Sequence, residues 1–198
     1  MKTLGVGIVL MVALFFCLPY HLYMKQLWKK NPEKSWEKAR RFVSGFFRFE
    51  LKLSGCKVNV IGKENIPQDG PVLFVGNHRS YFDILIYHEA IGKPLGFLAK
   101  KEMEKIPLLP LYMRDIGCLF LDREDIKQGL SVIKQGTEYM KQGHSMVVFP
   151  EGTRNQTDTL LPFREGGYKM AEKSKSPIVP VSICRSDLML ESAPKKRI

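Results

Sequence analysis

The sequence lacks the patterns that define several large classes of protein. Its four cysteines are far apart and form no C-x-x-C pair, which argues against a disulfide scaffold and against a zinc ribbon. It has no internal repeat and no low-complexity segment. Acidic residues are few, with 20 Asp and Glu against 31 Lys and Arg, so the formal net charge is +11. A chain of 198 residues, 44% of them hydrophobic, is expected to form one domain, at most with an appendage, whose thiols are reduced and buried.

The excess positive charge is concentrated near the N-terminus. Residues 1–60 hold 11 Lys or Arg and three Asp or Glu, whereas residues 61–198 hold 20 and 17. A basic balance indicates either nucleic acid or an anionic membrane surface as a partner. Because the basic third also contains the most apolar segment, we expect a membrane phospholipid surface and no nucleic acid.

The segment between Lys2 and Lys25 contains no charged residue. About 20 apolar residues span a bilayer core, so Thr3–Met24 is long enough to anchor the chain. A cleaved signal peptide is the alternative, but no convincing small-x-small cleavage site precedes the aromatic and basic stretch Tyr20–Trp28. We therefore expect an uncleaved anchor in the inner membrane. The lysines that follow it outnumber Lys2, which predicts that the rest of the chain lies on the cytoplasmic side.

The next segment, Pro32–Leu53, is predicted to be a basic amphipathic helix. Its aromatic and aliphatic residues alternate with Lys and Arg, a pattern typical of helices that lie in the membrane interface. A helix that packs its aromatic residues on the folded domain would show the same pattern. We therefore divide the chain into a membrane-anchoring part, residues 1–54, and a second part, residues 55–198.

From about Gly55 the pattern changes to short apolar runs separated by turns and helical stretches. Alternating strands and helices with apolar strands predict an α/β fold with a largely parallel sheet flanked by helices, preceded by the N-terminal membrane-anchoring segment. The predicted strands are Val58–Ile61, Val72–Val75, Phe97–Ala99, Cys118–Leu121, Met146–Phe149 and Ile178–Ile183, and the predicted helices are Tyr81–Ile91, Asp125–Gln142 and Gly166–Ser174.

In such sheets, functional residues gather in loops beyond the carboxyl ends of the strands. One such loop places His78 five residues before Asp83. A carboxylate can fix the tautomer of an imidazole and stabilise the imidazolium that forms when the ring takes a proton. The stretch Ser80–Asp83 is also a capping box for the following helix, which explains it without chemistry.

A second loop, Phe149-Pro-Glu-Gly-Thr-Arg154, follows the strand at Met146–Phe149. Glycine allows a backbone to approach a ligand closely, and arginine offers a planar fork for phosphate. Arg123 and Lys100 also end predicted strands. Such cations are typical of an anion site, although scattered surface cations are common in any basic protein.

Four stretches together resemble the ordered sequence blocks of the glycerolipid acyltransferases, most closely the bacterial 1-acylglycerol-3-phosphate acyltransferase branch. They are Asn77-His-Arg-Ser-Tyr-Phe-Asp83, Gly117-Cys-Leu-Phe-Leu-Asp-Arg123, Phe149-Pro-Glu-Gly-Thr-Arg154 and Ile178-Val-Pro-Val181. One departure from the family pattern is the acidic position within Phe163-Arg-Glu-Gly-Gly167, which would alter the rim of the acceptor site.

The resemblance implies acyl transfer from acyl-CoA or acyl carrier protein to the sn-2 hydroxyl of lysophosphatidate, giving phosphatidate. The thioester is a co-substrate, and neither a metal nor a bound cofactor is implied. The implied catalytic residues are His78 as general base and Asp83 as its partner. The implied substrate-binding residues are Lys100, Arg123, Glu151, Gly152, Thr153 and Arg154.

Other functions fit parts of the sequence. The acceptor could be another lysophospholipid, a lyso-aminolipid or glycerol-3-phosphate. A serine hydrolase would use Ser80 or Ser145, but no G-x-S-x-G elbow is present. An inactive membrane-anchored scaffold would not depend on His78.

Overall fold

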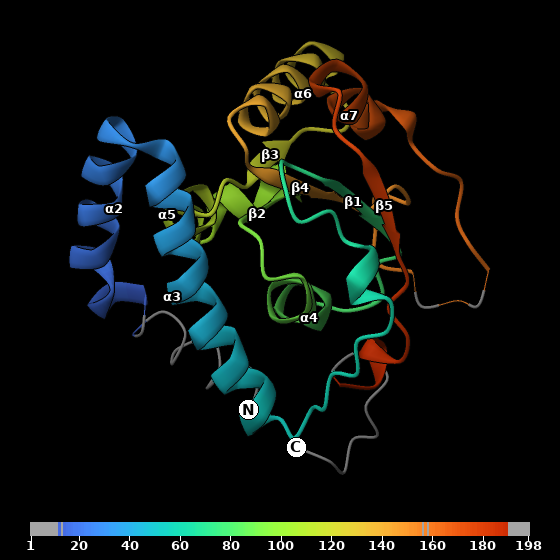
Figure 1. Cartoon of the computed structure of the whole chain (residues 1–198), viewed down its shortest axis with the longest axis horizontal. Helices are drawn as coiled ribbons and strands as arrows, with labels where there is room; N and C mark the ends of the chain where they lie inside the picture. Colours follow the sequence, from blue (N-terminus) through green and yellow to red (C-terminus); the bar gives the residue numbers. More distant parts are fainter. Residues whose placement is uncertain (1–11, 13, 156, 158, 190–198) are drawn as a thin grey trace.

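The structure is a computed structural model and describes residues 12, 14–155, 157 and 159–189. At its centre lies a five-stranded sheet in the order β3-β2-β4-β1-β5 (Figure 1), and every pair of neighbouring strands is parallel. The strands are β1 (Leu73–Gly76), β2 (Leu95–Lys100), β3 (Leu119–Leu121), β4 (Ser145–Val148) and β5 (Ile178–Val181). The helices are α2 (Leu18–Lys30), α3 (Pro32–Leu53), α4 (Phe82–Ile91), α5 (Leu109–Asp115), α6 (Ile126–Lys141) and α7 (Tyr168–Ser174).

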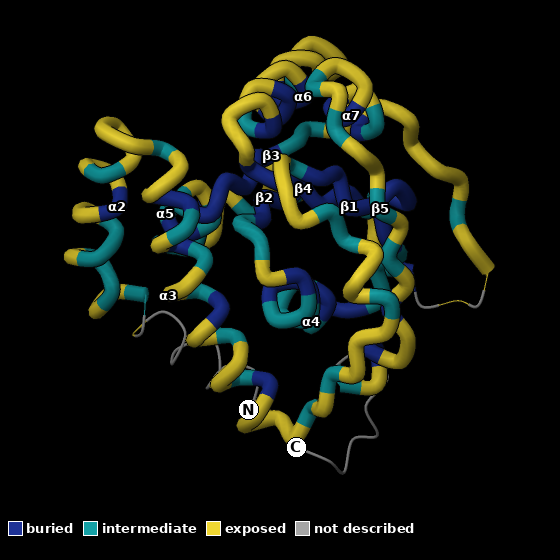
Figure 2. Tube along the Cα trace, in the orientation of Figure 1, coloured by how far each residue is buried: buried dark blue, intermediate teal, exposed yellow. Residues whose placement is uncertain are grey.

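Helices cover both faces of the sheet. Side chains alternate along a strand, so Leu73 and Val75 of β1 enter one buried cluster with α6 and α7, while Phe74 enters another with α4. All four residues of β1 and of β4 are buried, and the central strands are dark in Figure 2. Burial on both faces explains why these strands are apolar without interruption. The predicted α/β fold with a parallel sheet is confirmed.

Most predicted elements of the α/β part are present, and one is wrong. Residues Val58–Ile61 do not form a strand. Ile61 is 90% exposed, and the segment makes no ladder with a neighbouring strand, without which an apolar run stays in an irregular conformation. The short helix α5, which begins next to Pro110, was not expected.

Part of the predicted membrane anchor, Thr3–Met24, lies outside the described residues, namely residues 3–11 and 13. Its described end belongs to α2, whose residue Met24 is buried in the same cluster as Phe74. Tyr20 of α2 stacks on Phe42 of α3, with ring centroids 4.2 Å apart. Within the described residues, no helix combines the length and the hydrophobicity needed to cross a membrane.

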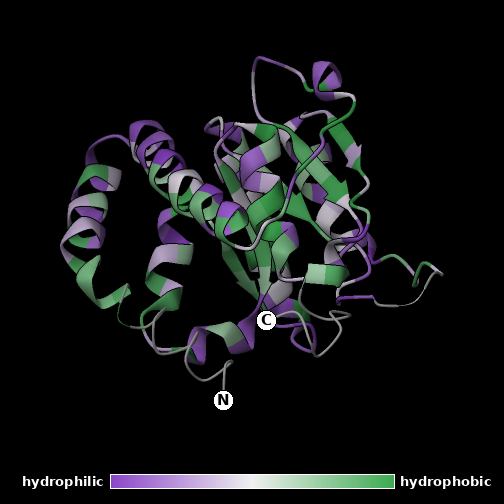
Figure 3. Cartoon of the chain, turned by 90° about the horizontal axis from the view of Figure 1, so that it is seen from below, coloured by the Kyte–Doolittle hydropathy of each residue, from purple (hydrophilic) through white to green (hydrophobic). Residues whose placement is uncertain are grey.

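Helix α3 begins where the sequence predicts. The side chain of Asn31 accepts a hydrogen bond from the backbone N–H of Lys34 at 2.9 Å, and Pro32 occupies the first turn. One side of α3 packs on the domain, because Trp36 is buried and stacks on His144 with centroids 4.2 Å apart. In Figure 3, both α2 and α3 carry hydrophobic and hydrophilic patches.

The other side of α3 is an exposed apolar stripe, which we call the α3 stripe. Its members are spaced by three or four residues, which places them on one side of the helix. They are Phe42, Phe46, Phe49 and Leu53, of which Phe49 is 62% and Leu53 77% exposed. Packing on the domain therefore accounts for part of the helix and leaves these side chains largely exposed, although Phe42 is stacked on Tyr20 of α2.

The cysteines are free thiols, as expected, but their burial differs. Cys118 is buried, and burial raises its thiol pKa to about 12. Cys17 and Cys56 are half-buried, and Cys184 is exposed. The expectation of uniformly buried thiols is wrong, since Cys184 follows the edge strand β5.

Candidate active site

The loop after β1 brings His78 and Asp83 together. Nδ1 of His78 lies 2.8 Å from Oδ2 of Asp83. Because an ionised carboxylate can only accept, Nδ1 carries the proton and the other ring nitrogen, Nε2, is the basic one. The Asp83 side chain is fully buried, whereas that of His78 is 17% exposed. The carboxylate is thus hidden from solvent, and the imidazole edge reaches the surface.

The same carboxylate also starts helix α4. Its Oδ2 atom accepts hydrogen bonds from the backbone N–H groups of Arg79 at 2.7 Å and Ser80 at 2.9 Å. The Ser80 hydroxyl accepts from the backbone N–H of Phe82 at 3.1 Å. The N–H groups of Arg79 and Ser80 lie just before α4, and that of Phe82 is one of the donors that the first turn of a helix leaves unpaired. The Asp83 carboxylate therefore both contacts His78 and holds the backbone where α4 begins, so the two interpretations of this stretch are compatible.

The imidazole ring is held on one face as well. It lies flat on the ring of Phe149, with centroids 4.1 Å apart and an interplanar angle of 12°. Nε2 of His78 has no hydrogen-bond partner among the residues that the structure describes. A ring fixed through one nitrogen and one face presents the other nitrogen to a substrate, which is what a general base requires.

The loop after β4 is tied to this histidine. The backbone N–H of Asn155 donates to the backbone oxygen of His78 at 2.7 Å. Glu151 is buried, and its Oε2 accepts from Nδ2 of Asn155 at 2.6 Å and from the backbone N–H of Leu161 at 2.9 Å. Glu151 therefore organises the loop from within. Its predicted contact with a substrate stays a prediction.

Two of the predicted cations lie on this loop or against it. The guanidinium of Arg154 stands over the ring of Tyr81, 3.8 Å from its centroid. Arg123 reaches Gly152, where an added Cβ would lie 3.8 Å from its Cζ. Burial and a nearby positive charge, that of Arg164, hold the pKa of Arg123 below its ordinary value. The structure thus brings Arg123 and Arg154 to the loop that adjoins His78.

The other predicted binding residues are placed differently. Nζ of Lys100 forms an ion pair of 2.8 Å with Glu102 at the end of β2, and both side chains are exposed. Thr153 is exposed. A surface pair of this kind is weak, so Lys100 can exchange its partner for an anionic ligand.

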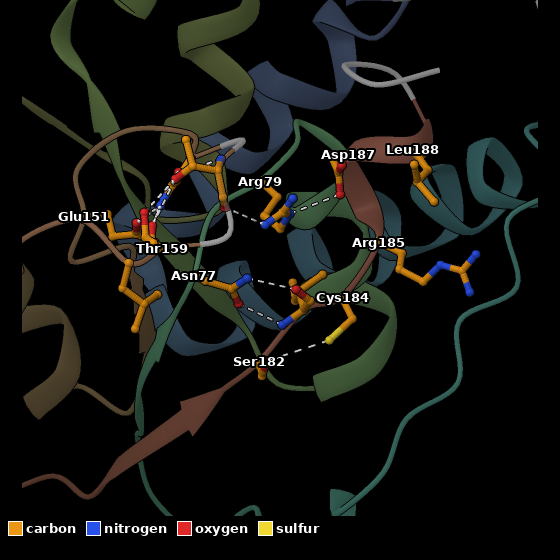
Figure 4. A pocket seen from close by; sticks show the side chains of 13 residues that line it. Asn77, Arg79, Glu151, Thr159, Ser182, Cys184, Arg185, Asp187 and Leu188 are labelled. Atoms are coloured by element: carbon orange, nitrogen blue, oxygen red, sulfur yellow. Dashed lines mark hydrogen bonds and ion pairs between the residues drawn. The ribbon is translucent and has the colours of Figure 1, made fainter. Parts of the chain in front are cut away.

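A cavity of about 420 Å³ lies beside the His78 loop. Figure 4 shows its wall, in which the side chain of Asn77 exchanges two hydrogen bonds of 2.8 Å with the backbone of Ile183. Arg79 points across to Asp187, with 3.1 Å between Nε and Oδ1. The cavity is lined by the loops after β1 and β4 and by the segment after β5, and its lining includes Asn77 and Arg79, which flank His78 in the sequence, but neither His78 nor Asp83.

Residues 57–184 match the protein family described as Acyltransferase. The chain belongs to this acyltransferase family. It is 38% identical over 172 residues to the probable 1-acyl-sn-glycerol-3-phosphate acyltransferase of Mycoplasma pneumoniae, a match that covers 84% of the chain and 62% of that relative. It is 34% identical over 136 residues to the 1-acyl-sn-glycerol-3-phosphate acyltransferase of Borreliella burgdorferi, covering 69% and 54%. The chain thus spans less than two thirds of the length of these relatives.

A solved structure with the same fold belongs to a named acyltransferase. It is the crystal structure of the 1-acyl-sn-glycerophosphate (LPA) acyltransferase PlsC from Thermotoga maritima. The two share 23% sequence identity with a TM-score of 0.61, and the match covers 91% of this chain and 75% of the other. This likeness shows the fold, and it covers more of the chain than the family match does.

The serine hydrolase alternative finds no support in the structure. The Ser145 hydroxyl is buried and accepts a hydrogen bond from the backbone N–H of Val72 at 3.1 Å. Ser80 is also buried, and its hydroxyl accepts from the first turn of α4. Neither serine is placed to attack a substrate.

Sequence analysis did not predict two residues near the candidate site. Asn155 follows the Phe149–Arg154 motif directly and joins its loop to His78. Arg164 lies close to Gly152, where an added Cβ would be 3.2 Å from its Nε. Arg164 could have been predicted from the sequence, because it is the basic residue of the Phe163–Gly167 stretch.

Proposed function

We propose that the protein transfers an acyl group from a thioester, acyl-CoA or acyl carrier protein, to the sn-2 hydroxyl of 1-acylglycerol-3-phosphate and releases phosphatidate. The observation that carries this proposal is the His78–Asp83 pair, in which Nδ1 of His78 is held by the carboxylate and the side chain of His78 reaches solvent. The names of the similar proteins support the choice of lysophosphatidate as the acceptor.

The proposed chemistry needs one base and no covalent acyl-enzyme. Nε2 of His78 takes the proton of the sn-2 hydroxyl as its oxygen attacks the thioester carbonyl. The buried carboxylate of Asp83 stabilises the imidazolium that results. When the tetrahedral intermediate collapses, the carbon–sulfur bond breaks and the imidazolium returns its proton to the leaving thiolate. A positioned base contributes about 10²–10⁴-fold to such a step.

Arg123 and Arg154, with Lys100 as a weaker contributor, would bind the acceptor phosphate. Their loops adjoin the histidine, and guanidinium groups bind phosphate oxygens through charge-assisted hydrogen bonds. Gly152 and Thr153 would shape the site, and Glu151 would hold the loop in place.

The enzyme would work at the cytoplasmic face of a membrane, where acceptor and product reside. The α3 stripe supports this proposal, because its phenylalanines are exposed next to basic residues such as Arg48 and Lys52. Residues 1–54 would then form the membrane-binding part. Replacing Phe46 and Phe49 with serine should reduce cosedimentation with vesicles of phosphatidylglycerol, whereas unchanged binding would contradict this role of α3.

The deciding assay offers lysophosphatidate with labelled acyl-CoA or acyl carrier protein to the wild type, to His78→Ala and to His21→Ala. The last is a matched control, because His21 forms its own 2.8 Å pair with Asp115 between α2 and α5. Phosphatidate formed by the wild type and the control, and reduced at least about 100-fold in His78→Ala, is the expected result. Full activity of His78→Ala would exclude this mechanism. If no protein forms phosphatidate, other lysolipids and glycerol-3-phosphate decide between another acceptor and an inactive scaffold.

A further inference from the structure

Two arginines from distant parts of the sequence meet over one glycine. Arg123 follows β3 and Arg164 precedes α7. A Cβ added to Gly152 would lie 3.2 Å from Nε of Arg164, 3.3 Å from its Cδ and 3.8 Å from Cζ of Arg123. Gly152 itself has a φ of +72°, a backbone conformation that residues other than glycine adopt only at an energetic cost. The backbone there is shaped so that two guanidinium groups can approach it.

Neither of these arginines forms an ion pair or hydrogen bond through its guanidinium with any residue in the described part of the chain. Other arginines of the protein are paired with carboxylates, among them Arg40, Arg48, Arg79 and Arg114. The carboxylate of Glu102 acts on Arg123 by raising its pKa. Glu102, however, already forms an ion pair with Lys100. Both side chains reach solvent, yet like charges that approach each other are unfavourable unless an anion lies between them.

The position of Arg164 is fixed by the loop that adjoins the catalytic histidine. Its backbone N–H donates to the backbone oxygen of Pro150 at 2.9 Å. Pro150 follows Phe149, whose ring stacks on His78. An anion held between Arg123 and Arg164 would therefore lie near the base, as expected of a phosphate joined to the reacting hydroxyl through a glycerol unit.

We propose that Arg164 is a specificity-determining residue, which together with Arg123 selects an acceptor that carries a phosphate monoester over one that carries a phosphodiester. This inference rests on the proposed acyltransferase function. A phosphate monoester carries a charge between −1.5 and −2 at pH 7, with a second pKa of about 6, and presents three terminal oxygens. A phosphodiester has a single charge and two terminal oxygens. Two guanidinium forks match the first set better.

The test compares two acceptors in the same detergent micelles, 1-acylglycerol-3-phosphate and 1-acylglycerophosphoglycerol. The proteins are the wild type, Arg164→Ala, Arg164→Lys and the charge control Lys134→Ala, which removes an exposed lysine of α6. Arg164→Ala should raise KM for the monoester roughly 10-fold or more, the loss expected for a hydrogen bond between charged groups. Its kcat should change much less, and its preference for the monoester should fall by the same factor. The KM of Arg164→Lys should lie between those of the wild type and Arg164→Ala, because lysine keeps the charge but lacks the planar fork of the guanidinium.

The pH dependence gives a second readout that a structural role would not move. As pH rises from 5.5 to 7.5 the acceptor loses its second phosphate proton, so KM of the wild type for the monoester should fall. Arg164→Ala should show a weaker dependence. Equal losses on both acceptors, or a loss confined to kcat, would overturn the proposal.

Binding separates this proposal from the proposed function. Affinity for the monoester is measured without turnover in His78→Ala and in the double variant with Arg164→Ala. Weaker binding in the double variant supports the anion site even if the wild type forms no phosphatidate. Equal binding, found alongside an active wild type, rejects the role of Arg164 alone.

Discussion

Asp83 holds His78 through Oδ2 at 2.8 Å and, through the same atom, accepts the backbone N–H groups that precede helix α4. The direction of the imidazole is therefore set by the start of a helix that packs against the sheet. A histidine supported in this way is held in place by the fold.

This double role predicts how Asp83→Asn behaves. The amide oxygen can still accept from the backbone, so the helix start is kept and the free energy of unfolding should fall by only about 1 kcal/mol. The neutral amide cannot stabilise an imidazolium, so kcat should fall about 100-fold or more. Steady-state kinetics and chemical denaturation measure the two quantities. A large loss of stability together with a small loss of kcat would mean that Asp83 serves the helix only.

Glu151 is predicted to act by positioning its loop. Its Oε2 accepts from both Asn155 and Leu161, and a glutamine oxygen can occupy the same place. Glu151→Gln should therefore keep most of the activity, whereas Glu151→Ala leaves buried donors unpaired and should lower the free energy of unfolding by about 1–3 kcal/mol. Thermal unfolding and KM for the acceptor distinguish the variants. If Gln were as damaging as Ala, the charge of Glu151 would be needed by the substrate.

The sheet could be predicted from the sequence because β1, β2 and β4 are apolar on both faces, which indicates burial between two layers of helices. The His78–Asp83 pair could be predicted because both residues belong to one short loop. The meeting of Arg123 and Arg164 could not, since 40 residues separate them and only the packed fold brings them together. The strand expected at Val58–Ile61 failed for a related reason, because an apolar run needs a neighbouring strand that the local sequence does not reveal.

Gly152→Ala tests the space between the two arginines. A side chain at φ +72° strains the backbone, and the new methyl group would push on Arg164. We expect a loss of roughly 1 kcal/mol in unfolding free energy, with a clear rise in KM for the acceptor. Gly70→Ala is the matched control, because Gly70 has a φ of +70° and nothing within 4 Å of an added Cβ. It should show the same loss of stability with KM unchanged. If both variants had a similar KM for the acceptor, Gly152 would not be part of the acceptor site.

Two buried histidines below helix α3 should make stability depend on pH. Burial lowers the pKa of His88 to about 4, helped by the charge of Arg40. Burial likewise lowers the pKa of His144 to about 3, although a hydrogen bond to the backbone oxygen of Ile116 opposes the shift. Both pKa values lie below the ordinary value of about 6.5, so the unfolded chain takes up these protons first. Stability from this source is complete above about pH 7 and falls as the pH drops toward 4.

The size of the effect can be isolated with His88→Leu. Between pH 6 and pH 4.5 each neutral buried histidine contributes a slope approaching 1.4 kcal/mol per pH unit in the unfolding free energy. Neither ring nitrogen of His88 has a hydrogen-bond partner among the described residues, and its ring lies among Phe47 and Phe97, so leucine should be tolerated at pH 7. As the pH falls, the unfolding free energy of the wild type should therefore decrease more than that of the variant. Carboxylates that titrate in the same range affect both proteins equally, so they do not change this difference. Parallel curves across this range would mean that His88 is already accessible to protons in the folded protein.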